Sequence, residues 1–178
     1  VTSPDPLQVV DTNFILPTCA GDCDGSIALQ LTGGTEPFTF EWSDDQTTNP
    51  AFGLCAGQYR VTITDANDCP SLVLTLDLEE PDPVSITFDP DSIQGVTCFD
   101  GVPCDGAATA VASGGGAGTG QYTFIWESGT TEVNVSTSTA TNLCQGFQTL
   151  TVSDANGCST TDSVDIPDHH ECLLHCRS

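Results

Sequence analysis

The chain has 178 residues, with ten cysteines, no lysine, two arginines and a formal net charge of −23. Phosphate groups are bound by cationic side chains, so this balance excludes a nucleic acid partner and argues against an anionic membrane surface. Nor does any segment approach the roughly 20 apolar residues of a membrane-spanning helix, so membrane insertion is not expected. Cysteines this numerous, without metal-binding CxxC spacing, indicate an oxidising, extracellular compartment.

Apolar and polar residues alternate through the first half of the chain, which predicts half-buried β-strands. The alternating runs are Ile27 to Leu31, Phe38 to Trp42, Tyr59 to Ile63 and Leu72 to Leu78. Turn-forming residues separate them at Gly33-Gly34, Asp44-Asp45, Asn49-Pro50 and Asp65-Ala66-Asn67. About seven short strands with a tryptophan near the middle are typical of an Ig-like β-sandwich.

The second half repeats the first, motif by motif. Cys23-Asp24-Gly25 returns as Cys104-Asp105-Gly106, and Thr39-Phe40-Glu41-Trp42 as Thr123-Phe124-Ile125-Trp126. Each half opens with a Pro-Asp-Pro segment, at Pro4 and at Pro81, and such a linker restricts bending because proline fixes its own φ. We therefore predict an all-β chain of two tandem Ig-like β-sandwich domains, residues 1–81 and 82–168, with a short tail over 169–178.

The order of these motifs resembles the SprB repeat. The residues that carry the resemblance are Cys-Asp-Gly-Ser at 23–26, Gly-Gly-Thr at 33–35, Pro-Phe-Thr-Phe-x-Trp at 37–42, Leu-Cys-Ala-Gly at 54–57 and Thr-Asp-Ala-Asn-x-Cys at 64–69. It covers both halves, although the second has Ala107 in place of Ser26 and a glycine-rich insertion over 113–120. SprB repeats occur in series in gliding adhesins and other surface proteins of Bacteroidota. The resemblance thus implies export, a cell-surface fibre, and a role in adhesion or motility.

The resemblance also guides the disulfides, since four cysteines in each half allow three pairings. In such a sandwich Cys23 and Cys55 lie at the same end, which favours a bond between them and leaves Cys19 for Cys69. By repetition we expect Cys104 to pair with Cys144 and Cys98 with Cys158. Each bond closes a long loop and is expected to add about 3–4 kcal/mol through the unfolded state.

The residue inventory predicts that the chain is not an enzyme. Its histidines, His169, His170 and His175, all lie in the tail, and no lysine can serve as a base. No free cysteine nucleophile is expected inside the disulfide-bonded domains.

No cofactor is expected, and calcium is the alternative. Hard oxygen ligands occur at Asp22, Asp24, Asp65 and Asn67. No EF-hand or nonapeptide pattern accompanies them. A hairpin turn beside a cystine accounts for Asp65 and Asn67, so we favour a structural role for these residues.

The tail contains Cys172 and Cys176 between histidines. On a helix, His169, Cys172, His175 and Cys176 would share one face and could bind zinc. We favour a disulfide, either local or to a neighbouring subunit, because the compartment is oxidising.

Three residues lie in glycosylation patterns. Asn134-Val135-Ser136 is an N-glycosylation sequon. Ser92 and Ser163 follow aspartate and precede an apolar residue, which resembles the O-glycosylation motif of exported Bacteroidota proteins.

We expect a non-catalytic structural unit of an extracellular filament or cell-surface adhesin, which polymerises or acts as a rigid spacer. Its partners would be other copies of itself or neighbouring repeats of a longer chain. The alternative is a module that binds a glycan or a surface. Sugar binding favours aromatic side chains on loops, whereas Trp42 and Trp126 lie on alternating strands and are predicted to be core residues.

Overall fold

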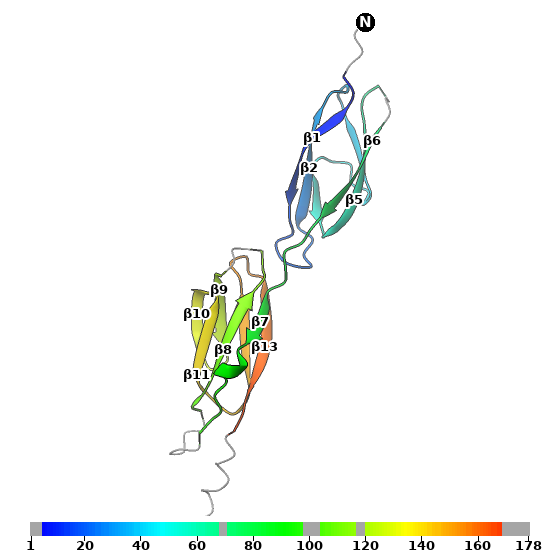
Figure 1. Cartoon of the computed structure of the whole chain (residues 1–178). Helices are drawn as coiled ribbons and strands as arrows, with labels where there is room; N and C mark the ends of the chain where they lie inside the picture. Colours follow the sequence, from blue (N-terminus) through cyan, green and yellow to red (C-terminus); the bar gives the residue numbers. More distant parts are fainter. Residues whose placement is uncertain (1–4, 68–70, 98–103, 117–119, 169–178) are drawn as a thin grey trace, which may run out of the picture. The chain divides into compact units, whose positions relative to one another are not determined.

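The computed structural model describes residues 5–67, 71–97, 104–116 and 120–168 (Figure 1). The chain divides into two compact units, Val1–Pro81 and Asp82–Ser178. In the described ranges their regular structure consists of β-strands, apart from a short 3-10 turn at Pro90–Ser92. Within the described ranges no helix has the length and apolarity to cross a membrane. The predicted all-β class is confirmed.

Two three-stranded antiparallel sheets form the first unit. One has the order β1-β2-β4 and the other β3-β5-β6. Side chains from both sheets meet in a core that includes Ile27, Trp42 and Val61, all buried as the alternation predicts. This division of strands is that of an Ig-like sandwich with one strand fewer. The strand bounds are β1 Gln8–Ile15, β2 Gly25–Thr32, β3 Thr39–Trp42, β4 Ala51–Leu54, β5 Gly57–Thr64 and β6 Leu72–Leu78.

The described part of the first unit has six strands, not the expected seven or so, because side chains replace backbone pairing after Trp42. The Gln46 amide donates to the carbonyl of Phe52 (2.9 Å) and accepts from its backbone N–H (3.0 Å). Asn49 does the same to Leu29, at 2.7 and 2.8 Å. Each amide thus imitates one residue of a neighbouring strand.

The second unit has a three-stranded sheet of order β11-β8-β7 and a four-stranded sheet of order β10-β9-β12-β13. Phe124, Trp126 and Leu150 are buried between them. The arrangement is that of an Ig-like sandwich in which β10 extends the second sheet. The strand bounds are β7 Ser85–Phe88, β8 Gly106–Ser113, β9 Tyr122–Trp126, β10 Thr131–Val135, β11 Thr137–Leu143, β12 Gly146–Ser153 and β13 Ser159–Ile166.

Each sandwich has two ends, which we name by the direction of the chain. The proximal end is where the chain enters the unit, and it includes the loops after β2 and β5 in the first unit. The distal end is where the chain leaves, and it includes the loops after β1 and β4. Since β5 has eight residues and runs from the distal to the proximal end, the two ends are roughly 25 Å apart.

Candidate functional site

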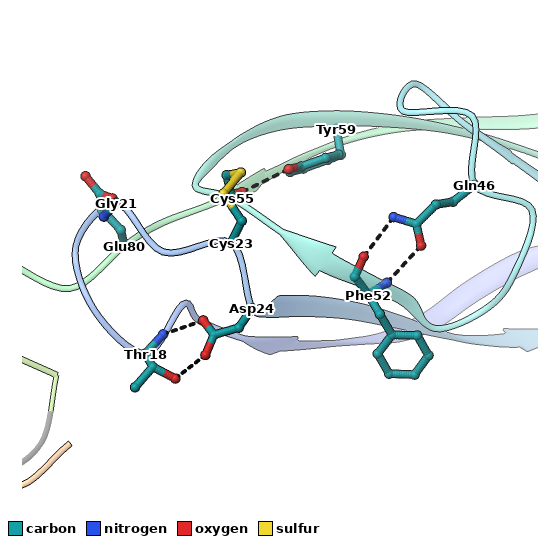
Figure 2. Close-up of a disulfide and its surroundings, with 9 residues drawn as sticks. All are labelled: Thr18, Gly21, Cys23, Asp24, Gln46, Phe52, Cys55, Tyr59 and Glu80. Atoms are coloured by element: carbon teal, nitrogen blue, oxygen red, sulfur yellow. Dashed lines mark hydrogen bonds between the residues drawn. A yellow bond between two sulfur atoms is a disulfide. The ribbon is translucent and has the colours of Figure 1, made fainter. Parts of the chain in front are cut away.

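The distal end of the first unit is fastened by a disulfide and three sets of hydrogen bonds (Figure 2). Cys23, just before β2, is bonded to Cys55, just after β4. The Asp24 carboxylate accepts from the backbone N–H of Thr18 at 2.8 Å and also from its hydroxyl. The other two contacts are the Tyr59 hydroxyl donating to the Cys55 carbonyl at 2.9 Å and the Gly21 N–H donating to Glu80 Oε2 at 2.8 Å.

Thr18 also tunes the charge of this loop. Its hydroxyl, and then its backbone N–H, hold the pKa of the Asp24 carboxyl below the ordinary 3.8. Both donors stabilise the ionised form, in which the Asp24 carboxylate accepts two hydrogen bonds. The residue is exposed, so the contact fixes the loop while remaining in water.

The distal end of the second unit shares the disulfide and the threonine–aspartate pair. Cys104 is bonded to Cys144, and Asp105 accepts from the Thr97 N–H at 2.7 Å and from its hydroxyl. Gln148 takes the place of Tyr59, because its amide donates to the Cys144 carbonyl at 3.1 Å. The threonine–aspartate pair and the disulfide therefore recur together.

The proximal ends are also alike, and each is organised by a buried aspartate. Asp65 accepts from the N–H of Thr35 (3.1 Å) and of Asn67 (3.2 Å), which ties the loop after β2 to the turn after β5. The Gly34 N–H donates to the carbonyl of Asp5 at 2.8 Å, so the segment before β1 is held there too.

In the second unit Asp154 occupies the position of Asp65. It accepts from the N–H groups of Gly116 (3.1 Å), Asn156 (2.9 Å) and Cys158 (2.9 Å). Asp65 and Asp154 are each 6% exposed. A buried carboxylate is costly unless it is paired, and here backbone donors compensate it.

Residues 17–47 match the SprB repeat family. This stretch of the first unit is similar to an SprB repeat. The match spans most of the distal loop, β2 and β3 of the first unit, including Thr18, Cys23 and Asp24. A search of curated proteins finds no match.

Solved structures with some likeness are all distant. They are a C-terminal 282-residue fragment of intimin in complex with the intimin-binding domain of its translocated receptor (15% identity, TM-score 0.38), an amphioxus IgVJ-C2 molecule (14%, 0.30) and domains 4–9 of the surface layer protein SbsC (12%, 0.34). The alignments cover 90%, 89% and 94% of this chain and 64%, 97% and 30% of those chains. The chain thus spans under two thirds of the intimin fragment. With every TM-score below 0.5, these likenesses say nothing about its function.

The four calcium candidates of the first unit are not brought together. Asp22 and Asp24 lie at the distal end, whereas Asp65 and Asn67 lie at the proximal end. Across the described ranges no three acidic, histidine or cysteine side chains gather where they could hold a metal ion. The described hydrogen bonds of Asp24 and Asp65 connect loop segments. A calcium site at these residues stays a prediction.

Of the predicted disulfides, Cys23–Cys55 and Cys104–Cys144 are present. Cys19 and Cys158 are also disulfide-bonded. Their predicted partners, Cys69 and Cys98, lie outside the described residues, as do the tail cysteines Cys172 and Cys176 and the three histidines. The bond and zinc site considered for the tail therefore stay predictions.

The three glycosylation candidates differ in their surroundings. The Ser92 hydroxyl donates to the Asp89 carbonyl (2.7 Å) and accepts from the Thr109 N–H (2.9 Å), so it is engaged in the 3-10 turn. Ser163 on β13 and Asn134 on β10 are exposed. Modification of any of the three stays a prediction.

Sequence reasoning placed the two tryptophans correctly but missed the threonine partners. Trp42 and Trp126 are buried core residues. Thr18 and Thr97 each precede a cysteine, and this repeated Thr-Cys pair was the signal that could have identified them.

A shallow hollow of about 260 Å³ lies beside Arg60, lined also by Glu41, Trp42, Ser43 and Thr62.

Proposed function

We propose that the chain is a non-catalytic structural segment of a cell-surface adhesin or extracellular fibre, in which each unit acts as a rigid spacer or a polymerising subunit. The observation that carries this is the identical fastening of both distal ends, by one disulfide and one threonine–aspartate pair. The two units differ in their strands and insertions, yet both have this disulfide and this threonine–aspartate pair. Because the polar groups of these loops bond to one another, the recurring contacts favour a structural role for the distal ends.

The disulfides would limit how far a stretched unit extends. Cys23 and Cys55 are 32 residues apart, and Cys104 and Cys144 are 40 apart. A bond between each pair removes the enclosed residues from the path of a pulling force. At about 3.6 Å per residue, these loops withhold roughly 115 and 144 Å of length.

The experiment is to pull the full chain by its two termini in optical tweezers, first oxidised and then reduced. Release of these two loops should lengthen the reduced chain by up to about 260 Å more on complete unfolding. A chain that unfolds to the same length in both states would contradict the mechanical role. The double variant Cys23→Ser/Cys55→Ser, stretched without reductant, shows how much of the gain is due to the first unit.

Location is tested separately, by immunogold labelling of the cells that produce the protein. Under the proposal the label decorates surface fibres and remains when soluble protein is washed away. Label confined to the cell interior would contradict it.

The alternative, a glycan- or surface-binding module, is favoured by one observation. Phe147 is 74% exposed and Phe52 is 61% exposed, and exposed aromatic rings can stack on sugars. The buried tryptophans cannot serve this purpose. Screening against a glycan array, with Phe147→Ala beside the wild-type chain, tests it: binding that the substitution abolishes would support the alternative.

A further inference from the structure

The outer face of the four-stranded sheet in the second unit carries little charge. Antiparallel partners lie on the same face of a sheet, so the buried pair Leu150–Trp126 marks the inner face and the next pair, Thr151–Ile125, the outer one. On β12 and β13 the outward residues are serine or threonine except at one position, where Phe147 lies opposite Asp165.

Three large apolar side chains stand among these hydroxyl groups. Ile125 on β9 is 50% exposed, Val133 on β10 is 57% exposed and Phe147 is 74% exposed. The nearest carboxylates, Glu127 and Asp165, lie toward the distal end, because Glu127 donates its N–H to the carbonyl of Thr149 near the start of β12. The middle and proximal parts of the face are therefore neutral.

The corresponding face of the first unit is different. The tryptophans align the two sheets, because each is paired with a buried residue of the next strand. Two charged side chains and an amide in the first unit thus correspond to two apolar side chains and a hydroxyl in the second. The first unit has Glu41, Gln58 and Arg60 where the second has Ile125, Phe147 and Thr149.

The net charge of −23 limits how copies of this chain can meet. Such acidic copies repel one another, and they approach most easily through surfaces that lack carboxylates. We propose that the outer face of β10-β9-β12-β13 packs against the same face of a second copy of the chain. This deepens the proposed structural role and rests on it, because it gives a polymerising subunit a lateral contact.

The side chains favour a protein sheet over a sugar as the occupant. Isoleucine, valine, threonine and phenylalanine pack well on a pleated surface, and the side chains of stacked sheets interdigitate about 10 Å apart. Sugars stack on aromatic rings, which Ile125 and Val133 lack. A two-fold axis across the strands would place Glu127 and Asp165 of one copy over the neutral proximal part of the other.

The size of the face predicts a weak contact. With strands about 4.8 Å apart and about 3.3 Å per residue, it covers roughly 400 Å² on each copy. Stable interfaces bury about 1,200–2,000 Å² in total, so a single pair of faces associates only transiently. Many such pairs along neighbouring fibres would add up, because each contact raises the effective concentration of the next.

Sedimentation equilibrium of the full, oxidised chain tests the contact. The sample is material that runs as a monomer in denaturing electrophoresis without reductant, so that covalent multimers do not contribute. The weight-average mass should rise with protein concentration up to about 1 mM in 1 M NaCl. The rise should be smaller in 0.1 M NaCl, where repulsion is less screened. A mass that stays that of one chain in both salts would overturn the proposal.

Two substitutions place a carboxylate on the face. Phe147→Glu and Ile125→Glu should each abolish the rise in mass, and both side chains are exposed, so the unit should stay folded, which hydrogen exchange at Val152 checks. Gln58→Glu is the matched control. It adds a carboxylate at the equivalent position of the first unit, opposite Asp77 as Phe147 is opposite Asp165, and should leave the rise unchanged. Equal losses from Phe147→Glu and Gln58→Glu would mean that net charge alone matters, which contradicts the proposal.

A glycan array separates the other occupant. A wild-type chain that stays monomeric but binds a neutral polysaccharide, with binding lost in Phe147→Glu, would show that a sugar polymer covers the face and that a second copy does not. Failure of self-association beside the expected pulling result would refute this contact and leave the rigid spacer standing. Self-association beside label confined to the cell interior would support the contact and refute the cell-surface role.

Discussion

The two units agree at their ends and differ along their first strand. In the first unit β1 pairs with β2 over its whole length, with one register shift between Val9 and Asp11. In the second, β7 ends at Phe88 and the 3-10 turn follows. Beyond the turn, Gln94 forms an antiparallel bridge with Ala107, and Val96 forms a parallel bridge with Asp168. The first strand of the second unit thus changes from one sheet to the other.

Two prolines account for this difference. Pro90 lies in the 3-10 turn, and proline cannot donate to a strand ladder. Val96 then donates its N–H to the Pro167 carbonyl at 3.0 Å. The residue before Thr18, corresponding to Val96 before Thr97, is Pro17, which has no N–H to make that bond. The two units thus share the disulfide and the threonine–aspartate contact at their distal ends and differ along this edge.

The largest expected effect is a loss of stability when the buried tryptophan of either core is replaced. Trp42→Ala and Trp126→Ala should each destabilise their own unit by about 3–5 kcal/mol, because a large buried side chain leaves a cavity. The indole N–H of Trp126 donates to the buried Ser138 hydroxyl at 2.9 Å. Because Ser138 would lose this partner, the loss should be about 1 kcal/mol greater for Trp126→Ala. Trp42 donates to the carbonyl of exposed Thr48, which water can satisfy.

Hydrogen exchange of the full chain measures the free energy of unfolding of each unit separately, from the amides of Val61 and Val152. The unsubstituted unit is the control in each case. Equal losses in the two units would contradict the contribution assigned to Ser138.

A smaller loss of stability is expected from adding a Cβ at the closely packed glycines of the two proximal ends. Gly33 and Gly114 have positive φ angles of 68° and 82°, and an added Cβ would lie 2.2 Å from the Pro6 carbonyl oxygen and 2.0 Å from that of Pro83. Alanine at either position should cost about 2–3 kcal/mol, from backbone strain and overlap together.

Gly129→Ala is the matched control, because its φ is 93° but nothing lies within 4 Å. It should cost only about 1 kcal/mol. Thermal unfolding of the three variants gives the ranking, and a control as damaging as Gly114→Ala would show that overlap with Pro83 is irrelevant.

The smallest expected effect is on the pH dependence of stability, through the pKa of Asp24. The folded-state pKa of Asp24 is lowered, so its stabilising contribution is present above the unfolded pKa and is lost as pH falls through the lower folded value. Thr18→Val removes the hydroxyl donor and should raise the pKa of Asp24 toward 3.8. NMR titration of the Asp24 carboxyl carbon measures it. Thr97→Val, in the other unit, should leave that pKa where it was.

Much of this protein could be predicted from the sequence because the decisive signals are local. Alternation placed Ile27, Trp42 and Val61 in the core, and the turn residues marked where strands end. The repeat of Cys-Asp-Gly pointed to matching units, and the resemblance to the SprB repeat favoured the Cys23–Cys55 bond that is present. The carboxylates were harder, because Asp24 and Asp65 look alike in sequence, and their partners are found only after the strands have paired.

Periodicity by itself determined the all-β class, and composition determined the large negative charge and the ten cysteines available for disulfides. Only the tertiary structure decided that Thr18 and Asp24 fasten a distal loop, that Asp65 is buried under backbone donors, and that Cys19 lies an entire strand away from the proximal end. The reason is physical: side-chain period and turn chemistry act over a few residues, whereas these contacts depend on strand register and on the length of β5.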